Sequence, residues 1–117
     1  MTYVDGFLAP VLAASSEEAY RAFAAKAAPI FREHGATRVV ECWEDDVQDG
    51  KTTDFRRAVK LEPGEHVVFS WIEWPDKATR DAGMKKVMDD PRMGPDDPMP
   101  FDGPRMIYGG FRAIVDA

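Results

Sequence analysis

The sequence predicts an α+β fold, in which a ferredoxin-like, split βαβ antiparallel sheet carries two helices on one face. Four segments have the alternation or the branched and aromatic content of strands, and two begin with helix-start residues followed by apolar residues at helical spacing. Along the chain these segments follow the order strand, helix, strand, strand, helix, strand. The 117 residues fit a single domain over residues 1–117, long enough to bury a core.

The first strand and the first helix are expected in the first third of the chain. Residues 2–9 (TYVDGFLA) alternate as a strand does, and Pro10 should limit its continuation. Ser15 can cap a helix, with Glu18 completing a capping box, and the helix should run to about His34. Its predicted buried stripe is Ala19, Phe23, Ala27, Ile30 and Phe31.

Two features should shape the end of this helix. Pro29 removes one backbone hydrogen bond and should kink the last turns. Gly35 can end the helix in a left-handed conformation.

The middle of the chain contains two expected strands. Residues 36–45 alternate, and residues 66–74 (HVVFSWIEW) form the strongest strand pattern. Both faces of the latter are largely apolar, so this strand should be central. Residues 52–61 are interpreted either as a short extra strand or as an irregular excursion.

A second helix should open at Pro75 and Asp76 and reach about Asp90. An irregular loop over 91–104 and a closing strand over 105–116 follow. The helix residues expected to face the sheet are Ala78, Ala82, Val87 and Met88.

Three glycines mark the contact between the first and last strands. In the predicted topology the final strand pairs with the first, so Gly6, Gly109 and Gly110 should lie near one another. Missing side chains there permit either strong coiling of the sheet or the close approach of a ligand, and both interpretations stay open.

The second face of the sheet needs a cover. Tyr3, Phe7, Val39 and Trp43, together with the apolar residues of 66–74, exceed what one helix-covered face can bury. We therefore expect a homodimer that packs sheet face against sheet face. The alternative is that some aromatic side chains stay half exposed.

Composition and charge exclude several classes of function. The net charge of −6 disfavours nucleic-acid binding, and no apolar run approaches the about 18 residues of a membrane span. The first residues lack the basic region of a signal peptide, and the lone Cys42 excludes an internal disulfide framework. Together these features favour the cytoplasm.

No strong catalytic, metal or cofactor motif is present, so neither a cofactor nor a metal is predicted. His34 and His66 fall in separate elements, and His34 is expected to stabilise a helix end. Cys42 is expected to be a buried, inert thiol.

Seven residues are candidate ligand contacts. Asp54, Phe55 and Arg56 lie in an irregular stretch where the guanidinium of Arg56 or Arg57 can grip a carboxylate. The alternative is a surface ion pair of these arginines with Asp54 or with the partner subunit. The others are Asp102 and Arg105 at the start of the last strand, and Trp71 and Tyr108, which, with Trp43 and Trp74, are candidates to line a cavity. Asp102 ordering a turn and aromatics packed in the core are the alternatives.

Four stretches, at 3–7, 41–60, 67–75 and 99–111, resemble the YbaA-like family, also named domain of unknown function 1428. The resemblance runs over nearly the whole chain in order. It implies the dimeric α/β-barrel superfamily, in which two ferredoxin-like sheets face each other, and it brings no established activity. The wider superfamily holds cofactor-free monooxygenases, isomerases, haem enzymes and ligand-sensing domains, so the fold alone predicts no reaction.

The sequence is therefore consistent with two functions. The first is a homodimer that binds a small molecule in a cavity between sheet and helices, and it rests on the absence of catalytic motifs. The alternative is a cofactor-independent monooxygenase- or isomerase-like enzyme acting on a small aromatic or carbonyl substrate.

Overall fold

A computed structural model describes residues 2–93 and 99–117. The described residues form an antiparallel four-stranded sheet with the order β2-β3-β1-β4, which confirms the α+β class and the central place of 66–74. The strands are β1 (Tyr3–Val11), β2 (Arg38–Trp43), β3 (His66–Trp74) and β4 (Ile107–Arg112), and the α-helices are α1 (Glu17–Glu33), α2 (Phe55–Ala58) and α3 (Lys77–Asp89). Single 3₁₀ turns occupy Pro91–Met93 and Gly103–Arg105.

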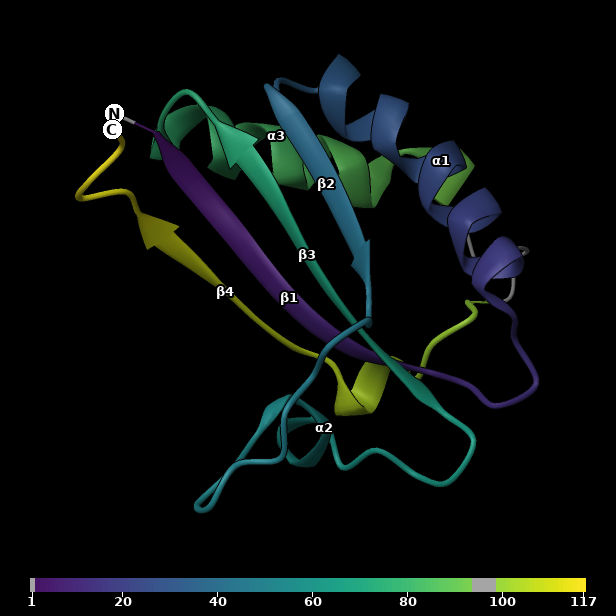
Figure 1. Ribbon diagram of the computed structural model, residues 1–117. Helices are drawn as coiled ribbons and strands as arrows, with labels where there is room; N and C mark the ends of the chain where they lie inside the picture. Colours follow the sequence, from purple (N-terminus) through teal and green to yellow (C-terminus); the bar gives the residue numbers. More distant parts are fainter. Residues whose placement is uncertain (1, 94–98) are drawn as a thin grey trace.

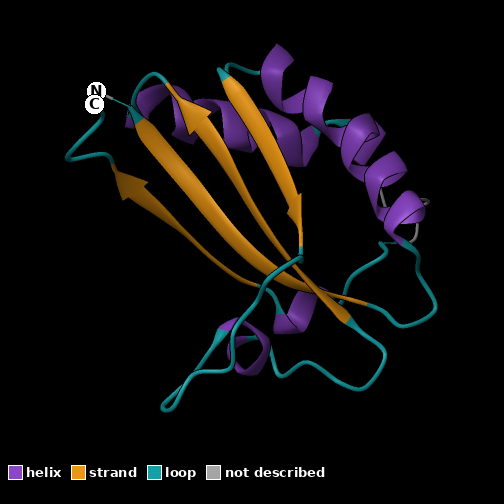
Figure 2. Cartoon of the chain, viewed as in Figure 1, coloured by secondary structure: helices purple, strands orange, loops and turns teal. Residues whose placement is uncertain are grey.

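The two long helices lie on the same side of the sheet (Figure 1). α1 contacts β2, α3 contacts β3, and the helices contact each other. β4 is the edge strand farthest from α1, and the chain between β2 and β3 extends beyond one end of the sheet (Figure 2). One face of the sheet is therefore covered, and we call the other the open face.

Strand register separates the residues of the two faces. Tyr3, Asp5, Ala9 and Val11 alternate on the covered face of β1. Tyr3 joins a buried cluster around Ile72 and Trp74, and Ala9 and Val11 join a second one around Tyr20 and Val68. The open face carries partly or largely exposed apolar side chains, namely Val4, Leu8, Val40, Phe69, Trp71, Ile107 and Phe111.

A buried ion pair ties α3 to the sheet. The Asp5 carboxylate, 3% exposed, accepts hydrogen bonds from Trp74 Nε1 at 2.9 Å and from the Arg80 guanidinium at 2.9 to 3.2 Å. The Arg80 guanidinium also lies 5.1 Å from the centre of the Tyr3 ring. Its hydrogen bonds to Asp5 raise the pKa of Arg80 above its ordinary value, so the guanidinium stays charged.

The predicted neighbourhood of the glycines is confirmed. Gly6 pairs with Gly109, and Asp5 pairs with Gly110. A Cβ on Gly110 would lie 2.5 Å from Tyr3 Oη and 2.7 Å from an Arg80 nitrogen. The absent side chain at Gly110 thus leaves room for the ion pair against the backbone of β4.

The first strand is longer than predicted, because β1 continues through Pro10 to Val11. The Pro10 carbonyl accepts a hydrogen bond from Asp102 N at 3.1 Å, beyond the point where β4 stops pairing at Leu8. The proline nitrogen faces this same side, so its missing N–H removes no hydrogen bond to β3.

The predicted start of the first helix is wrong by one residue. Ser15 N donates to Leu12 O within the preceding turn, and Ser16 is the cap, accepting from Ala19 N at 3.0 Å. The predicted buried stripe is confirmed in part, because Ile30 is buried and Phe23, Ala27 and Phe31 are half-buried. Ala19 is exposed, and the buried α1 residues are Tyr20, Ala24 and Ile30. The Tyr20 ring sets this rotation, because it packs toward Trp43 of β2. The ending at Gly35 is confirmed, with φ +113°.

The predicted stripe of the second long helix is also corrected. Val87 is buried, but Ala78 and Ala82 are exposed and Met88 is 73% exposed. Gly83 occupies the contact instead, because a Cβ there would lie 2.3 Å from the His34 carbonyl oxygen and 2.5 Å from the Trp74 ring. The helix thus approaches the core through its backbone, and residues one position away turn outward.

The remaining differences concern segments without clear periodicity. The stretch 52–61 contains the one-turn helix α2 rather than a strand, and Asp54 caps it by accepting from Arg57 N at 2.8 Å. The strands predicted at 36–45 and 105–116 are shorter at both ends. Part of the predicted loop 91–104, residues 94–98, lies outside the described residues.

Replacing the buried carboxylate tests the link between α3 and the sheet. Asp5→Asn should lower the free energy of unfolding by about 3 kcal/mol, because Arg80 loses its charged partner in a low-dielectric setting. Urea unfolding measures the loss. Asp81→Asn is the control, since it removes an exposed partner of the same guanidinium, and an equal loss in both variants would contradict the central role of Asp5.

Candidate functional site

A cleft of about 400 Å³ lies between α1 and the edge strand β2. The small side chains Ala24, Ala25 and Ala28 form its α1 wall and leave the space open. The polar and aromatic residues that line it come from both elements and include Tyr20, Arg21, Glu41, Cys42 and Trp43.

Local periodicity explains why these side chains meet. Tyr20, Ala24 and Ala28 recur at four-residue intervals, so they lie on one face of α1. Glu41 and Trp43 alternate along β2, and the register pairs them with Ser70 and Val68 on the covered face. Because α1 packs on that face, Tyr20 meets Glu41 at the edge of the sheet.

A short hydrogen bond joins the two sides of the cleft. Tyr20 Oη donates to Glu41 Oε2 at 2.5 Å. Burial raises the pKa of Tyr20 above its ordinary value, and the adjacent Glu41 carboxylate raises it further. Desolvation also raises the pKa of Glu41, although hydrogen bonds from Tyr20 and Ser70 oppose that shift. Glu41 is an exposed residue of β2, so its carboxylate lies in the solvent-facing wall of the cleft rather than in the core.

Trp43 lies between two polar pairs. Its ring centre is 6.1 Å from that of Tyr20 and 5.0 Å from that of His66. His66 Nδ1 lies 3.0 Å from Glu44 Oε1. Each of the two rings that neighbour Trp43 is therefore hydrogen-bonded to a carboxylate, His66 to Glu44 and Tyr20 to Glu41. The end of β2 thus combines aromatic surface with groups that accept or release protons.

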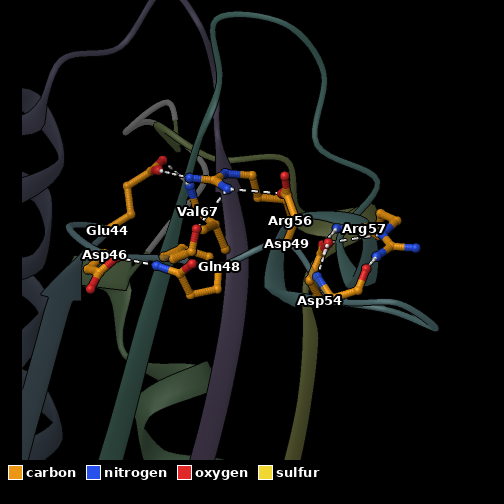
Figure 3. A network of polar contacts seen from close by, with 10 residues as sticks. Glu44, Asp46, Gln48, Asp49, Asp54, Arg56, Arg57 and Val67 are labelled. Carbon is orange, nitrogen blue, oxygen red and sulfur yellow. Dashed lines mark hydrogen bonds and ion pairs between the residues drawn. The ribbon is translucent and has the colours of Figure 1, made fainter.

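The predicted residues Asp54 and Arg56 form ion pairs within the segment between β2 and β3 (Figure 3). Asp54 pairs with Arg57 at 2.9 Å, and two backbone N–H groups help to hold its pKa down at about 2. Arg56 contacts Glu44 at 3.3 Å and donates to the Val47 carbonyl at 3.0 Å. The ion pair expected as the alternative for Asp54 is therefore present, with Arg57.

Asp102 and Arg105 join the same segment to the start of β4. Arg105 donates to both Glu65 oxygens at 2.7 and 2.8 Å, to Asp102 at 2.7 Å and to the Lys60 carbonyl at 3.0 Å. The Arg105 guanidinium lowers the pKa of Glu65 to about 2. These donors are committed to holding two loops together.

The aromatic candidates do not converge on one cavity. Trp71 lies on the open face, because it pairs with Gly6, whereas Tyr108 pairs with Phe7 on the opposite face and is 73% exposed. Phe55 packs edge-on against Phe69 at 6.1 Å, beside a shallow open-face depression of about 180 Å³. Trp74 belongs to the core, and Trp43 alone of the predicted aromatics lines the α1–β2 cleft.

Sequence reasoning missed Tyr20 and Glu41 as cleft residues. The four-residue spacing of Tyr20, Ala24 and Ala28 was available as a signal, but it competes with the stripe through Phe23 and Ile30. Cys42, expected to be buried, is only partly buried and lines both the cleft and the open-face depression.

Two features are absent from the described part of the chain. No three His, Cys, Asp or Glu side chains there gather closely enough to hold a metal ion. Within residues 2–93 and 99–117, no helix has the length and apolar character needed to cross a membrane.

The sequence of this chain matches a family of known proteins over most of its length. The model of the family described as "Protein of unknown function (DUF1428)" matches residues 2–103. The chain is 62% identical over 117 residues to "Uncharacterized protein YbaA" of Escherichia coli strain K12, covering 99% of each chain. A protein of the same description from Shigella flexneri matches to the same extent.

The Glu65–Arg105 pair predicts a specific acid response. Glu65 has a pKa of about 2 in the folded protein against an ordinary 4.5, so its stabilisation is complete above pH 4.5 and is lost as pH falls toward 2. Urea midpoints measured between pH 6 and pH 2 should fall less steeply for Glu65→Gln than for the wild type. Identical slopes would contradict this role, and Glu62→Gln, a loop neighbour, is the control.

Proposed function

This chain belongs to the DUF1428 family of proteins of unknown function, and we propose that it binds a small molecule in the cleft between α1 and β2. The cleft agrees with the expectation of a cavity between sheet and helices, at the edge of the sheet. Its volume of about 400 Å³ falls within the range of small-molecule sites.

One observation carries the proposal, namely the Tyr20–Glu41 hydrogen bond in the wall of the cleft. A partly desolvated carboxylate is costly to hold in an apolar setting, and the Tyr20 hydroxyl offsets only part of that cost. A ligand that bonds to Glu41 and packs against Trp43 would bring a specific polar contact and apolar burial together. This combination is typical of ligand sites.

The ligand contacts in this proposal differ from those predicted. Arg56 and Arg105 are engaged by carboxylates and backbone carbonyls, and Asp54 caps α2. We assign these residues, with Asp102, to shaping the segment next to the cleft. Tyr20, Glu41 and Trp43 take their place as the contacts of the ligand.

We further propose that the protein is a cytoplasmic homodimer of the ferredoxin-like, dimeric-barrel type. The strand order β2-β3-β1-β4 supports the topology. The open face supports the assembly, because Phe69, Ile107 and Phe111 are 46%, 45% and 64% exposed there. A second copy, packing its own open face against these residues, would bury them.

A second candidate function is an isomerase-like enzyme that needs no cofactor and acts on a small aromatic or carbonyl substrate. The Tyr20–Glu41 pair favours it, since a carboxylate and a phenol in contact can accept and return a proton within one cleft. Chemical conversion of a bound carbonyl compound, lost in Glu41→Gln while binding persists, would distinguish this enzyme from a binding protein.

Filling the cleft tests the binding proposal. Ala25 is an exposed residue of α1 that lines the cleft, and Ala22 is exposed on the same helix outside its lining. In a ligand-observed NMR screen of small alcohols, ketones and amines, compounds bound by the wild type should bind Ala25→Phe at least about tenfold more weakly, a loss of about 1.4 kcal/mol. Ala22→Phe should bind them normally. Equal binding by the two variants would place the ligand elsewhere.

Charge on the open face tests the dimer. The wild type should sediment as a dimer at micromolar concentration, and Phe111→Glu should shift it toward the monomer by placing carboxylates in the apolar contact. Tyr108→Glu is the matched control, because Tyr108 is exposed on the other face of the same strand. A monomeric wild type, or dissociation by both variants, would refute the sheet-to-sheet arrangement.

A further inference from the structure

We propose that the ligand of the α1–β2 cleft is a small organic cation, whose ammonium group is held by the Glu41 carboxylate against the aromatic faces of Tyr20 and Trp43. This inference rests on the proposed binding function and names the chemical class of the ligand. It is carried by the charges, the aromatic lining and a parallel arrangement elsewhere in the molecule.

The Glu41 carboxylate has no cationic partner among the described residues. Its carboxylate accepts a hydrogen bond from the neutral Tyr20 hydroxyl, and it forms no ion pair with any residue in 2–93 or 99–117. The almost fully buried carboxylates of Asp5 and Glu65 each have a cationic partner, Arg80 and Arg105. Glu41 is more exposed than either, but desolvation at the cleft wall raises its pKa and it has no such partner, so a bound cation would supply the missing countercharge.

The charged residues that line the cleft include more carboxylates than basic groups. Arg21 is the one basic residue of the lining, and it is engaged by Glu17 at 2.8 Å and also by Glu18. The lining of the cleft thus carries two carboxylates, those of Glu17 and Glu41, and one guanidinium. An anionic ligand would meet net negative charge, whereas a cation would supply the missing partner.

Two aromatic residues line the cleft together with Glu41. Tyr20 and Trp43 contribute two neighbouring rings, 6.1 Å apart and inclined by 43°, beside the carboxylate. The face of an aromatic ring attracts a cation, and indole is the strongest such partner among side chains. Because one carboxylate and two rings converge, the site favours an ammonium group over a neutral group of equal size.

The molecule already contains this arrangement in another place. The Arg80 guanidinium is held by the Asp5 carboxylate while lying 5.1 Å from the centre of the Tyr3 ring. In that case the cation comes from the protein's own α3. At the cleft the carboxylate and the rings are present, and the ligand supplies the cation.

Proton linkage provides a second signature. An ammonium ligand favours the ionised form of Glu41, so its affinity should fall as pH drops through the pKa of Glu41, which desolvation raises. The groups that face this carboxylate are Tyr20, Arg21 and Glu17 of α1, Cys42 of β2 and the uncharged Ser70 of β3. Because Glu41→Gln removes this carboxylate alone, an acid loss of affinity that disappears in Glu41→Gln identifies Glu41 as its source.

The experiment compares ligands that differ in charge alone. We would titrate 2-phenylethylamine against 2-phenylethanol, and choline against 3,3-dimethylbutan-1-ol, and follow the Trp43 indole signal by NMR. Each cation should bind at least about tenfold more tightly than its neutral counterpart, which corresponds to about 1.4 kcal/mol. The preference should shrink as pH is lowered.

Two variants locate the effect. Glu41→Gln keeps the shape and an acceptor for Tyr20 but removes the charge, so the preference for the cation should vanish and the acid dependence with it. Glu18→Gln removes a nearby charge that does not line the cleft, and the preference should change by less than about threefold, as expected for a solvent-exposed charge.

Each result decides the inference. A neutral compound that binds as tightly as its cation, a preference retained in Glu41→Gln, or no binding of either cation at millimolar concentration would overturn it. The proposed binding function fails separately, when no compound in the wider screen distinguishes Ala25→Phe from Ala22→Phe.

Discussion

The position of α3 on the sheet depends on one buried carboxylate. Asp5 of β1 binds Trp74 of β3 and Arg80 of α3, so three elements meet at one side chain. With α3 held there, Gly83 lets its backbone approach the carbonyl at the end of α1. α1 then packs beside α3 and over β2, which is where the cleft opens. The candidate site is thus a consequence of how an ion pair elsewhere on the same covered face seats the helices.

The distribution of countercharges separates residues that build the fold from those available for a ligand. Arg57, Arg80 and Arg105 each bind a carboxylate whose side chain is almost fully buried. Their geometry organises loops and layers, and it commits the guanidinium donors. Glu41 differs, because its hydrogen bonds come from neutral hydroxyl groups while it lines an open cleft. A carboxylate in that situation is poised to bind a donor from outside the chain.

The two apolar surfaces of the molecule have different shapes and suit different partners. The open face of the sheet is broad and carries exposed Phe69 and Phe111 side chains, which suits the flat surface of a second sheet. The α1–β2 cleft is concave, narrow and partly polar, which suits a small molecule. Trp43 lies between them, since it lines both the cleft and the open-face depression. Assembly and ligand binding would therefore share Trp43 and Cys42 without sharing one surface.

The sequence by itself determined the α+β class, the order of the main elements and the strand 66–74, because alternation, capping residues and turn residues act over a few neighbouring positions. The topology inferred from that order then placed Gly6, Gly109 and Gly110 near one another. Only the tertiary structure decided that Tyr20 and Ala24 join Ile30 on the buried side of α1, that Pro10 continues a strand, and that Tyr20 meets Glu41. Each of those outcomes depends on a partner distant in sequence, such as Trp43 for Tyr20 and Asp102 for Pro10. A one-residue rotation of a helix costs little in local propensity, but it changes which side chains reach the sheet, so packing alone selects between the alternatives.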